Sequence, residues 1–478
     1  MTSRNSLGSL LLLLSCTESI AFGQVGSLAQ PQVRITQPAA TSGNVTLAGN
    51  VHPFIAQASS SAPADLSTPM QHMVLHLQSN AAQEAALEEL IALQNNPASA
   101  TYHQYLTPQA FATQFGVASS DLATVSAWLQ SKGFTIEQVT GGNRSIVFSG
   151  TAGQVAAAFQ TQMNQYTVDG VQHLANASDP KIPAAFASVV GGVLKLHNFP
   201  YQAHVITSAD KIPANTVMPG FAPAGARWLV PGDYYTLYDT NPLLSAGIDG
   251  TGQSIAVIAR SNIYATDIQG FRSLMGLKAN NPQVIVTNSD PGIVNDDTVE
   301  TTLDTEWAGA IAPGANIKVI VSSTGSAGDG IDLSSLYAVT NNVAPILTLS
   351  YGACEANMGA TELAFYNSLW KQASAQGQTV LVASGDSGAA GCDSASSGTA
   401  AYGKGVNGLC SSPYATCVGG TEFVEGSNPG QYWLPSSPGS TIGSAISYLP
   451  ETVWNESGSS NGVSSLWAGG GGASTVYA

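Results

Sequence analysis

Two different rhythms of apolar and polar residues divide the chain. From residue 68 to residue 200, segments that alternate like strands are mixed with segments whose apolar residues recur at helical spacing. The alternation predicts strands at 72–78, 134–139, 144–150, 162–168 and 191–199. The helical spacing, with capping residues before several of the segments, predicts helices at 81–95, 107–116, 118–133 and 151–160. A mixture of this kind predicts an α+β open sandwich.

Beyond residue 233 the rhythm changes to short, nearly continuous apolar strands that alternate with helices. Strands are predicted at 253–260, 283–288, 316–323, 344–350 and 379–384. Helices are predicted at 267–277, 300–312, 334–342 and 362–377. Strands this apolar must be buried on both faces, which predicts an α/β fold with a doubly wound parallel sheet. Sites in such sheets lie where the strands end, as "SYG" at 350–352 and "SGDSG" at 384–388 do.

The remaining segments set the expected domain boundaries. Residues 24–67 are rich in Ala, Ser, Gln and Pro and predict a poorly ordered leader. Residues 201–232 are loop-like and punctuated by proline, which predicts a linker between an α+β region at 68–200 and an α/β domain at 233–478.

The N-terminus resembles an export signal. Arg4 provides a positive start, residues 7–14 are apolar, and small residues follow at Ala21 and Gly23, so residues 1–23 are predicted to be a signal peptide. An alternative is a lipid attachment site at Cys16, within "LLSC". No stretch is long enough to predict a transmembrane segment. We therefore expect a secreted, periplasmic or extracellular protein.

The charge balance narrows the class of partner. Only 9 % of the residues are charged and the net charge is −16. Nothing in such a chain could neutralise a row of phosphates, so nucleic acid is excluded as a partner. A surface poor in Lys and Arg is compatible with export into an acidic, protease-rich medium.

Four cysteines follow Cys16, and an even number in an exported chain favours disulfides over a metal site. We favour the pairs Cys354–Cys392 and Cys410–Cys417, although four cysteines allow three connectivities.

The letters GDSG at 385–388 raise the question of a serine nucleophile at Ser387. Such a serine needs a base, usually a histidine held by a carboxylate. No histidine follows His204, and the GDSG continues with two alanines. The sequence therefore argues against a trypsin-like site, and the segment needs another explanation.

Glu300 and Asp304 lie four residues apart on a predicted helix, which places both carboxylates on one face. Like charges at this distance should split their titrations and share a proton. A solvated helix face is the alternative. The small, apolar residues after Trp307 favour a buried helix instead, and buried paired carboxylates suggest a functional site.

Several motifs in order resemble the sedolisin (kumamolisin-like) family of serine-carboxyl peptidases. Residues 300–315 match its Glu-x-x-Leu-Asp-x-Glu and Ala-Gly-Ala-x-Ala-Pro-Gly-Ala pattern. Further matches are "ILTLSYG" at 346–352, "VLVASGDSGA" at 380–389, "SSPYATCVGGT" at 411–421 and "ETVWN" at 451–455. The resemblance implies a subtilisin-like fold, a Ser-Glu-Asp triad, protein or peptide substrates and acidic working pH. It also implies that residues 68–200 are an activation prodomain, an intramolecular inhibitor and folding aid, with the maturation site in the linker.

By the same resemblance, Glu300 would be the general base and Asp304 the carboxylate that orients it. Asp386 would hydrogen-bond the oxyanion, so Asp386 rather than Ser387 would be the functional residue of the GDSG segment. Ser350, Tyr351 and Gly352 would line the substrate cleft, or simply form a tight turn after a strand. A glutamate base suits acid, since a histidine would already be charged there.

One part of the family pattern has no match. The family nucleophile lies in Gly-Thr-Ser-x-x-x-Pro, whereas "GGTEF" has Glu422 at the corresponding place, and Ser474 lies in a glycine run that lacks the required setting. The family calcium site would also lie beyond this sequence, so we expect no cofactor in this chain. The first hypothesis is an incomplete peptidase precursor with a truncated sheet. The second is a non-catalytic secreted protein that binds peptides in its cleft.

Overall fold

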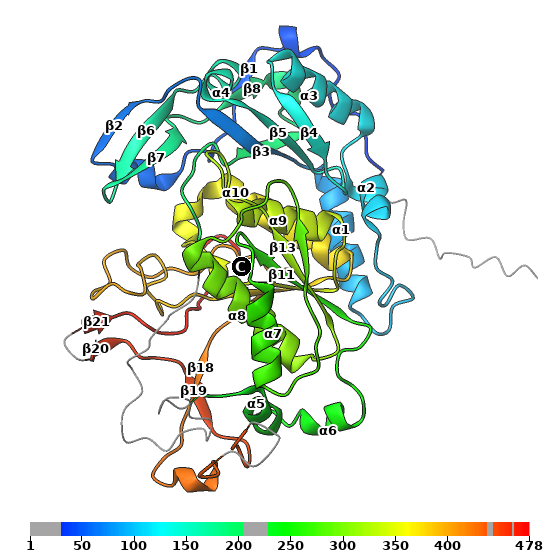
Figure 1. Cartoon of the computed structure of the whole chain (residues 1–478). Coiled ribbons are helices and arrows are strands. Elements are labelled where there is room, and N and C mark those ends of the chain that lie inside the picture. Colours follow the sequence, from blue (N-terminus) through cyan, green and yellow to red (C-terminus); the bar gives the residue numbers. More distant parts are fainter. Residues whose placement is uncertain (1–29, 204–227, 437–442, 461–462, 478) are drawn as a thin grey trace, which may run out of the picture.

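The computed structural model describes residues 30–203, 228–436, 443–460 and 463–477. Two sheets with different architectures are stacked, and helices α9 (Gly330–Thr340) and α10 (Glu355–Ala375) lie between them (Figure 1). The predicted signal peptide, Cys16 and residues 204–227 of the predicted linker lie outside the described residues. Among the described helices, none is long and apolar enough to cross a membrane.

The larger sheet has six parallel strands in the order β12-β13-β11-β14-β16-β17. The strands are β11 (Ser254–Ala259), β12 (Gln283–Val286), β13 (Asn316–Val321), β14 (Ile346–Leu349), β16 (Thr379–Ala383) and β17 (Thr416–Val418). From β11 the chain goes to the edge strand β12, returns to β13 beside β11, and then runs outward on the other side through β14, β16 and β17. Strands on both sides of β11 make the sheet doubly wound. The predicted α/β class is confirmed.

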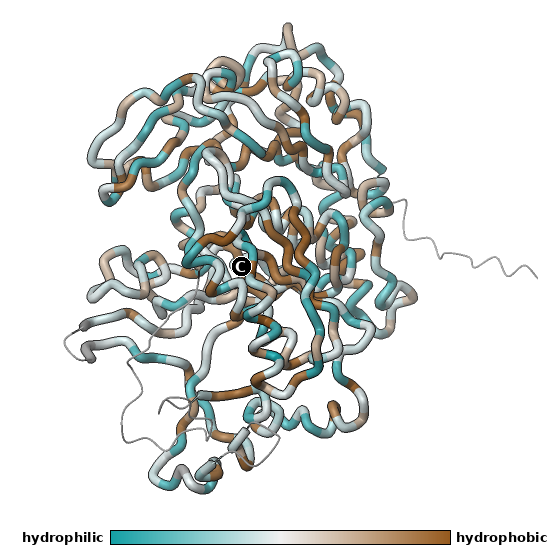
Figure 2. Tube along the Cα trace, viewed as in Figure 1, coloured by the Kyte–Doolittle hydropathy of each residue, from teal (hydrophilic) through white to brown (hydrophobic). Residues whose placement is uncertain are grey.

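Burial on both faces explains why these strands are apolar throughout. On one face, Val257 and Val319 pack in a cluster that includes Ala308 of α8 (Asn295–Ile311). On the other face, Ile258 and Ile320 pack with residues of α9 and α10. The apolar segments gather in these central strands in Figure 2. Helices α5 (Pro231–Leu237) and α7 (Ala265–Leu274) pack against the outside of α8.

The second sheet is antiparallel and belongs to residues before the linker. Its strands, in the order β4-β5-β3-β9, are β4 (Thr135–Val139), β5 (Ser145–Thr151), β3 (Pro69–Leu77) and β9 (Val190–Leu194). One face packs in a core with residues of α3 (Ser119–Ser131) and α4 (Ala152–Phe159). The other face presents Val74, Val147 and Leu194 to a core shared with α9 and α10. The sheet therefore has two apolar faces, and only one of them is covered by its own helices.

Helix α1 (Ala81–Gln94) packs on helix α2 (Pro108–Phe115) and on α10. Asn80 and Gln83 form a capping box at the start of α1. Strand β6 (Met163–Val168) pairs with β7 (Val171–Asn176), which the sequence reasoning missed. The turn between them, Asp169-Gly170, has positive φ at both residues and is a hairpin signal that could have revealed β7.

The expectation of a poorly ordered leader at 24–67 is wrong for the described part from residue 30. Strand β1 (Asn44–Thr46) pairs with β8 (Lys181–Pro183), and β2 (Ser60–Pro63) pairs with β6. Leu47 is buried in the core of the antiparallel unit. The composition was misleading because edge strands need few apolar side chains when backbone hydrogen bonds to neighbouring strands hold them.

The remaining elements are short. They are helix α6 (Asn241–Ser245), the pair β10 (Gln202–Ala203) and β15 (Tyr351–Gly352), the pair β18 (Thr421–Phe423) and β19 (Glu451–Val453), and the pair β20 (Gly458–Ser460) and β21 (Val463–Ser465).

Candidate active site

Helix α8 carries the two carboxyls that the sequence singled out, and it turns both toward the end of β14. Glu300 is buried, with 2 % of its surface exposed, and Asp304 is half-buried one turn further on. Ser350, the first residue after β14, donates a hydrogen bond from Oγ to Asp304 Oδ1 at 2.9 Å. The alternative of a solvated helix face is thus wrong for Glu300, and the structure brings Ser350 to the pair.

The electrostatics of the pair follow from its burial. Burial raises the pKa of Glu300 well above its ordinary value, the charge of Asp304 adds to the rise, and Ser350 opposes it. Burial also raises the pKa of Asp304, while contacts with Ser350 and Glu300 lower it. Glu300 Oε2 has no hydrogen-bond partner among the described residues. Burial therefore favours the protonated form of both carboxyls, and their titrations are coupled.

Asp386 follows β16 and lies in the "SGDSG" segment. It is half-buried, and burial raises its pKa. The charge of Asp386 contributes to the raised pKa of Glu300, which places the two groups within electrostatic reach. The backbone of the glycine-rich run fixes this segment, because Ala468 donates to Asp386 O at 3.0 Å and Gly470 to Gly385 O at 2.7 Å.

Two serines that could be taken for nucleophiles have other partners. Ser387 Oγ donates to the carbonyl of Asp393 at 2.8 Å, so its hydroxyl fixes a loop. Ser474 Oγ donates to Glu355 Oε1 at the start of α10. Neither hydroxyl is directed at Glu300 in this structure.

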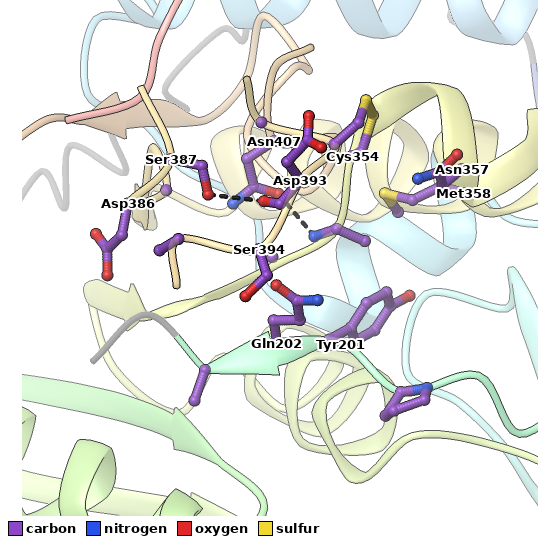
Figure 3. A pocket seen from close by; sticks show the side chains of 18 of the residues that line it. Tyr201, Gln202, Cys354, Asn357, Met358, Asp386, Ser387, Asp393, Ser394 and Asn407 are labelled. Atoms are coloured by element: carbon purple, nitrogen blue, oxygen red, sulfur yellow. Dashed lines mark hydrogen bonds between the residues drawn. A yellow bond between two sulfur atoms is a disulfide. The ribbon is translucent and has the colours of Figure 1, made fainter. Parts of the chain in front are cut away.

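A cavity of about 320 Å³ lies beside Asp386 (Figure 3). Gly352, the glycines of the "SGDSG" segment, Asn407 and Trp467 line it on the α/β side. Tyr201 and Gln202 line it from the segment that leads into the linker. Here β10 pairs antiparallel with β15, with Gln202 opposite Gly352 and Ala203 opposite Tyr351. The chain thus lays its own peptide strand along the predicted substrate-binding turn.

The three residues of that turn do different things. Gly352 lines the cavity, Ser350 contacts Asp304, and the Tyr351 side chain is buried, with 1 % of its surface exposed. The cation of Arg260 lies 5.0 Å from the centre of the Tyr351 ring. The turn is therefore a strand edge with buried supports, rather than a row of side chains that face a ligand.

Arg260 is a residue that the sequence reasoning missed. It follows β11, and its guanidinium makes two bonds to Asp297 of α8, at 2.8 and 3.0 Å. A third bond, of 2.6 Å, joins it to Asp329, the N-cap of α9. A lone arginine at the end of a buried strand, in a chain with only 14 Lys and Arg, was the available signal. Arg260 ties α8, α9 and β15 together around the carboxyl pair.

The four cysteines form the disulfides Cys354–Cys392 and Cys410–Cys417, which is the pairing that we favoured. The first joins the start of α10 to the loop after Asp386 and lines the cavity. Within the described ranges, no group of three or more His, Cys, Asp or Glu residues could hold a metal ion.

Comparison with known proteins places the chain among relatives. Residues 56–199 match the family model described as "Pro-kumamolisin, activation domain". The chain is 31 % identical over 417 residues to sedolisin of Pseudomonas sp. (strain 101), an alignment that covers 85 % of this chain and 65 % of the relative. It is 31 % identical over 435 residues to xanthomonalisin of Xanthomonas sp. (strain T-22), covering 82 % of this chain and 49 % of the relative.

A solved structure of Pseudomonas sedolisin, a serine-carboxyl proteinase in complex with pseudo-iodotyrostatin, is 28 % identical. The match covers 52 % of this chain and 63 % of that chain, with a TM-score of 0.40. The chain thus spans between about half and two thirds of the length of these relatives. Over more than four fifths of its length the chain is therefore similar to sedolisin and xanthomonalisin, and its residues 56–199 match the activation domain model.

Proposed function

We propose that the chain is the precursor of a serine-carboxyl peptidase that hydrolyses peptide bonds at acidic pH. Glu300 is the general base, Asp304 orients it, and Asp386 stabilises the oxyanion. The observation that carries the proposal is the buried carboxyl pair at the end of a parallel strand, one turn apart on α8 and held by Ser350. Buried like charges are costly, and they are retained where their titration is used.

The roles follow from where the protons lie. For Glu300 to accept the proton of an attacking hydroxyl, its own proton must first pass to Asp304 or to solvent. Asp304 can hold that proton because burial raises its pKa. Asp386 can donate a hydrogen bond to an oxyanion only while it is protonated, and the rise of its pKa by burial extends the range in which it is. The requirement on Asp386 favours acid, whereas the requirement on Glu300 is met when Asp304 holds the one proton of the pair.

The attacking group is the part that this chain does not identify. The serine motif of the family has no counterpart in the sequence, and the two serines near the cleft bond elsewhere. A triad without its nucleophile retains little turnover. We therefore propose that residues 1–478, taken alone, have at most residual activity.

The substrate in this proposal is an extended peptide that adds a strand to β15. The chain's own β10 supports this mode, because it pairs with Tyr351 and Gly352 in the antiparallel sense. As long as β10 occupies that edge, a substrate peptide cannot. Residues 30–203, here called the activation region, therefore act as an intramolecular inhibitor.

The same strand pairing supports the second candidate function, a secreted protein that binds peptides without cleaving them. The two functions differ in whether a peptide placed on β15 is hydrolysed.

The decisive experiment is to read the transcript past codon 478 and to assay the encoded protein on a denatured protein substrate at about pH 3 to 4. With a serine motif present, we expect hydrolysis that Glu300→Gln lowers by about 10²–10⁴-fold, the usual contribution of a general base. Ser387→Ala is the matched control and should retain activity.

For residues 1–478 alone, we expect no self-cleavage in acid. Efficient self-cleavage that Glu300→Gln abolishes would contradict the absence of a nucleophile. A verified stop codon, together with peptide binding but no hydrolysis, would favour the second function.

A further inference from the structure

Four aromatic rings stack where the activation region ends. The ring of Phe199 lies between His52, with centroids 4.3 Å apart, and His173, at 4.2 Å. The ring of His197 lies edge-on to His52 at 4.4 Å. Phe199 directly precedes Pro200 and the strand β10 that occupies the cleft. The stack therefore lies at the point where the chain leaves the activation region for the candidate active site.

His197, at the end of the stack, contacts helix α10 of the α/β domain. His197 Nε2 lies 2.9 Å from Glu362 Oε1 on α10. Lys195 Nζ lies 3.2 Å from the same oxygen and 3.6 Å from Asp332 Oδ2 on α9. Tyr201 donates from its hydroxyl to Asp332 and from its backbone to Asp329. These residues and His173 are the charged and titratable groups around the two inner histidines.

The geometry requires His52 and His197 to be uncharged while the two regions are docked. His52 Nδ1 accepts a bond from the Phe54 backbone N–H at 3.3 Å, so this nitrogen carries no proton. His197 Nδ1 is buried and has no hydrogen-bond partner among the described residues. A second proton on His52 would break its bond to Phe54, and one on His197 would bury an unpaired donor. Lys195 already supplies a positive charge beside them.

We propose that His52 and His197 form a proton-operated latch that holds the activation region on α10 while both rings are neutral and loosens it when they take up protons. The latch needs no catalytic step, so it stands or falls separately from the proposed peptidase activity. His52 precedes the residues that match the family model, so the match itself does not account for the latch.

The lowered pKa values of the two histidines agree with neutral rings in the docked form. Burial lowers the pKa of His52 to about 2, and His197 adds to the effect. Burial also lowers the pKa of His197, although Glu362 opposes the shift. Released histidines titrate near about 6.5. Docking is therefore at full strength above that pH and weakens as the pH falls toward the lowered values, by a factor of ten per pH unit for each additional proton that the released form binds.

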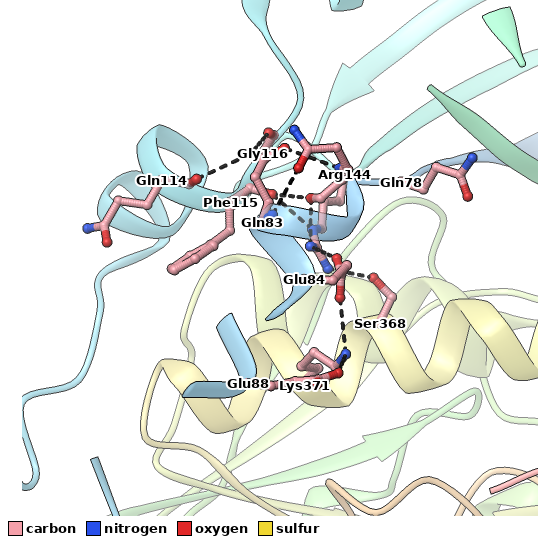
Figure 4. A network of polar contacts seen from close by, with 12 residues as sticks. Gln78, Gln83, Glu84, Glu88, Gln114, Phe115, Gly116, Arg144, Ser368 and Lys371 are labelled. Carbon is pink, nitrogen blue, oxygen red and sulfur yellow. Dashed lines mark hydrogen bonds and ion pairs between the residues drawn. The ribbon is translucent and has the colours of Figure 1, made fainter. Parts of the chain in front are cut away.

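A second contact between the regions titrates in a different window (Figure 4). Arg144, the residue before β5, donates to Glu84, and Lys371 of α10 donates to Glu84 at 3.0 Å and Glu88 at 2.8 Å. Burial would raise the pKa of Glu84, but the charges of Arg144 and Lys371 outweigh it and lower the pKa. This contact is complete above the ordinary glutamate pKa of about 4.3 and is lost only below it. Asp332 titrates between the two windows, because burial raises its pKa to about 6 in the docked form. Its proton uptake favours docking and so opposes the effect of the histidines.

The test is amide hydrogen exchange of β9 and α10 in the full chain from about pH 7 to 4.5, corrected for the intrinsic pH dependence of exchange. We expect the opening equilibrium to grow about tenfold per pH unit below about pH 6, for a net uptake of about one proton. His52→Asn keeps an acceptor for Phe54, and His197→Gln keeps a donor for Glu362, while neither new side chain titrates. The double variant should lose the acid-driven opening in this window and keep only the opposing effect of Asp332.

The exposed His103 provides the control, and His103→Asn should behave like the wild type. An unchanged pH slope in the double variant would overturn the latch and assign acid sensitivity to the carboxylates. If the double variant does not fold, the imidazole signals of the wild-type chain decide by NMR. Values near 6.5 for His52 and His197 in the docked form would also overturn it, whereas no titration above about pH 5 would support it.

Discussion

The protein buries two pairs of carboxyls, and their glutamates behave in opposite ways. Glu300 and Asp304 meet on α8 beside a serine hydroxyl. Asp332 and Glu362 meet between α9 and α10, but Lys195 and His197 lie against them. The pKa of Glu300 is raised by burial and by Asp304. Burial would also raise the pKa of Glu362, but Lys195 and His197 outweigh it and bring it to about 2.

The comparison shows that burial alone does not decide whether the pKa of a carboxyl is raised. Both glutamates are almost completely buried, with 2 % and 4 % of their surfaces exposed. Lys195 and His197 keep Glu362 charged, although burial still raises the pKa of Asp332 to about 6. Lys195 comes from the activation region, so the second pair is an ion-pair cluster only while that region is docked. Four substitutions test the contrast, from the largest expected effect to the smallest.

Glu362→Gln should destabilise the protein most. It leaves Lys195 buried with only Asp332 opposite, and loss of one partner of a buried ion pair costs about 3–5 kcal/mol. Because the pKa of Glu362 is lowered, its stabilisation is complete above the unfolded value and disappears as the pH falls toward about 2. Urea unfolding at pH 7 measures the loss. Glu89→Gln, at an exposed position, is the control. Equal urea midpoints for the two variants would show that the pairing of Glu362 with Lys195 does not stabilise the protein.

Arg260→Lys should cost about 2 kcal/mol, because a lysine cannot form the two parallel bonds to Asp297 and also reach Asp329. The measurement is a double-mutant cycle with Asp297→Asn at pH 7. Strong coupling is expected. Additive effects would show that Arg260 does not hold α8 through this carboxylate.

Glu300→Gln should have the opposite sign to Glu362→Gln. A raised pKa means that the stability is complete below the unfolded value and is lost as the pH rises through the folded one. Removing the titration should stabilise the protein by about 1–2 kcal/mol at pH 7 and change little at pH 4. Unfolding at both pH values checks this result. Destabilisation at pH 7 would mean that Glu300 is charged and paired in the native protein.

Ser350→Ala should have the smallest effect. It removes the hydroxyl that donates to Asp304, which should raise the pKa values of the pair further and cost about 1 kcal/mol above pH 6. Below pH 4 the carboxyls are protonated, and the variant should resemble the wild type. Ser387→Ala, which loses a bond to a carbonyl, should show no such pH dependence. If the loss of stability is the same at all pH values, Ser350 stabilises the turn and not the ionised carboxyl.

Much of the fold could be predicted because the periodicity of apolar residues within each segment indicates whether that segment is a strand or a helix. Every strand and helix expected from 68 to 200 and from 253 to 384 has a counterpart, although α10 begins seven residues before the expected start and β9 and α8 each differ by five residues at one end. The strand ends placed Ser350 and Asp386 on one edge of the sheet, and helical spacing placed Glu300 beside Asp304. The ordered leader and β7 were missed because backbone pairing and a two-residue turn, rather than apolar periodicity, create them.

The sequence by itself determined the alternation of elements, the doubly wound sheet, the carboxyl pair and the absence of a histidine base after residue 204. Only the tertiary structure decided which buried carboxyls receive a cation. Lys195 meets Glu362 across 167 positions of the chain, and Arg260 meets Asp329 across 69. Periodicity encodes which face of an element is buried. The charge that meets that face depends on how distant elements pack, and this packing separates the candidate catalytic pair from the pair that holds the activation region.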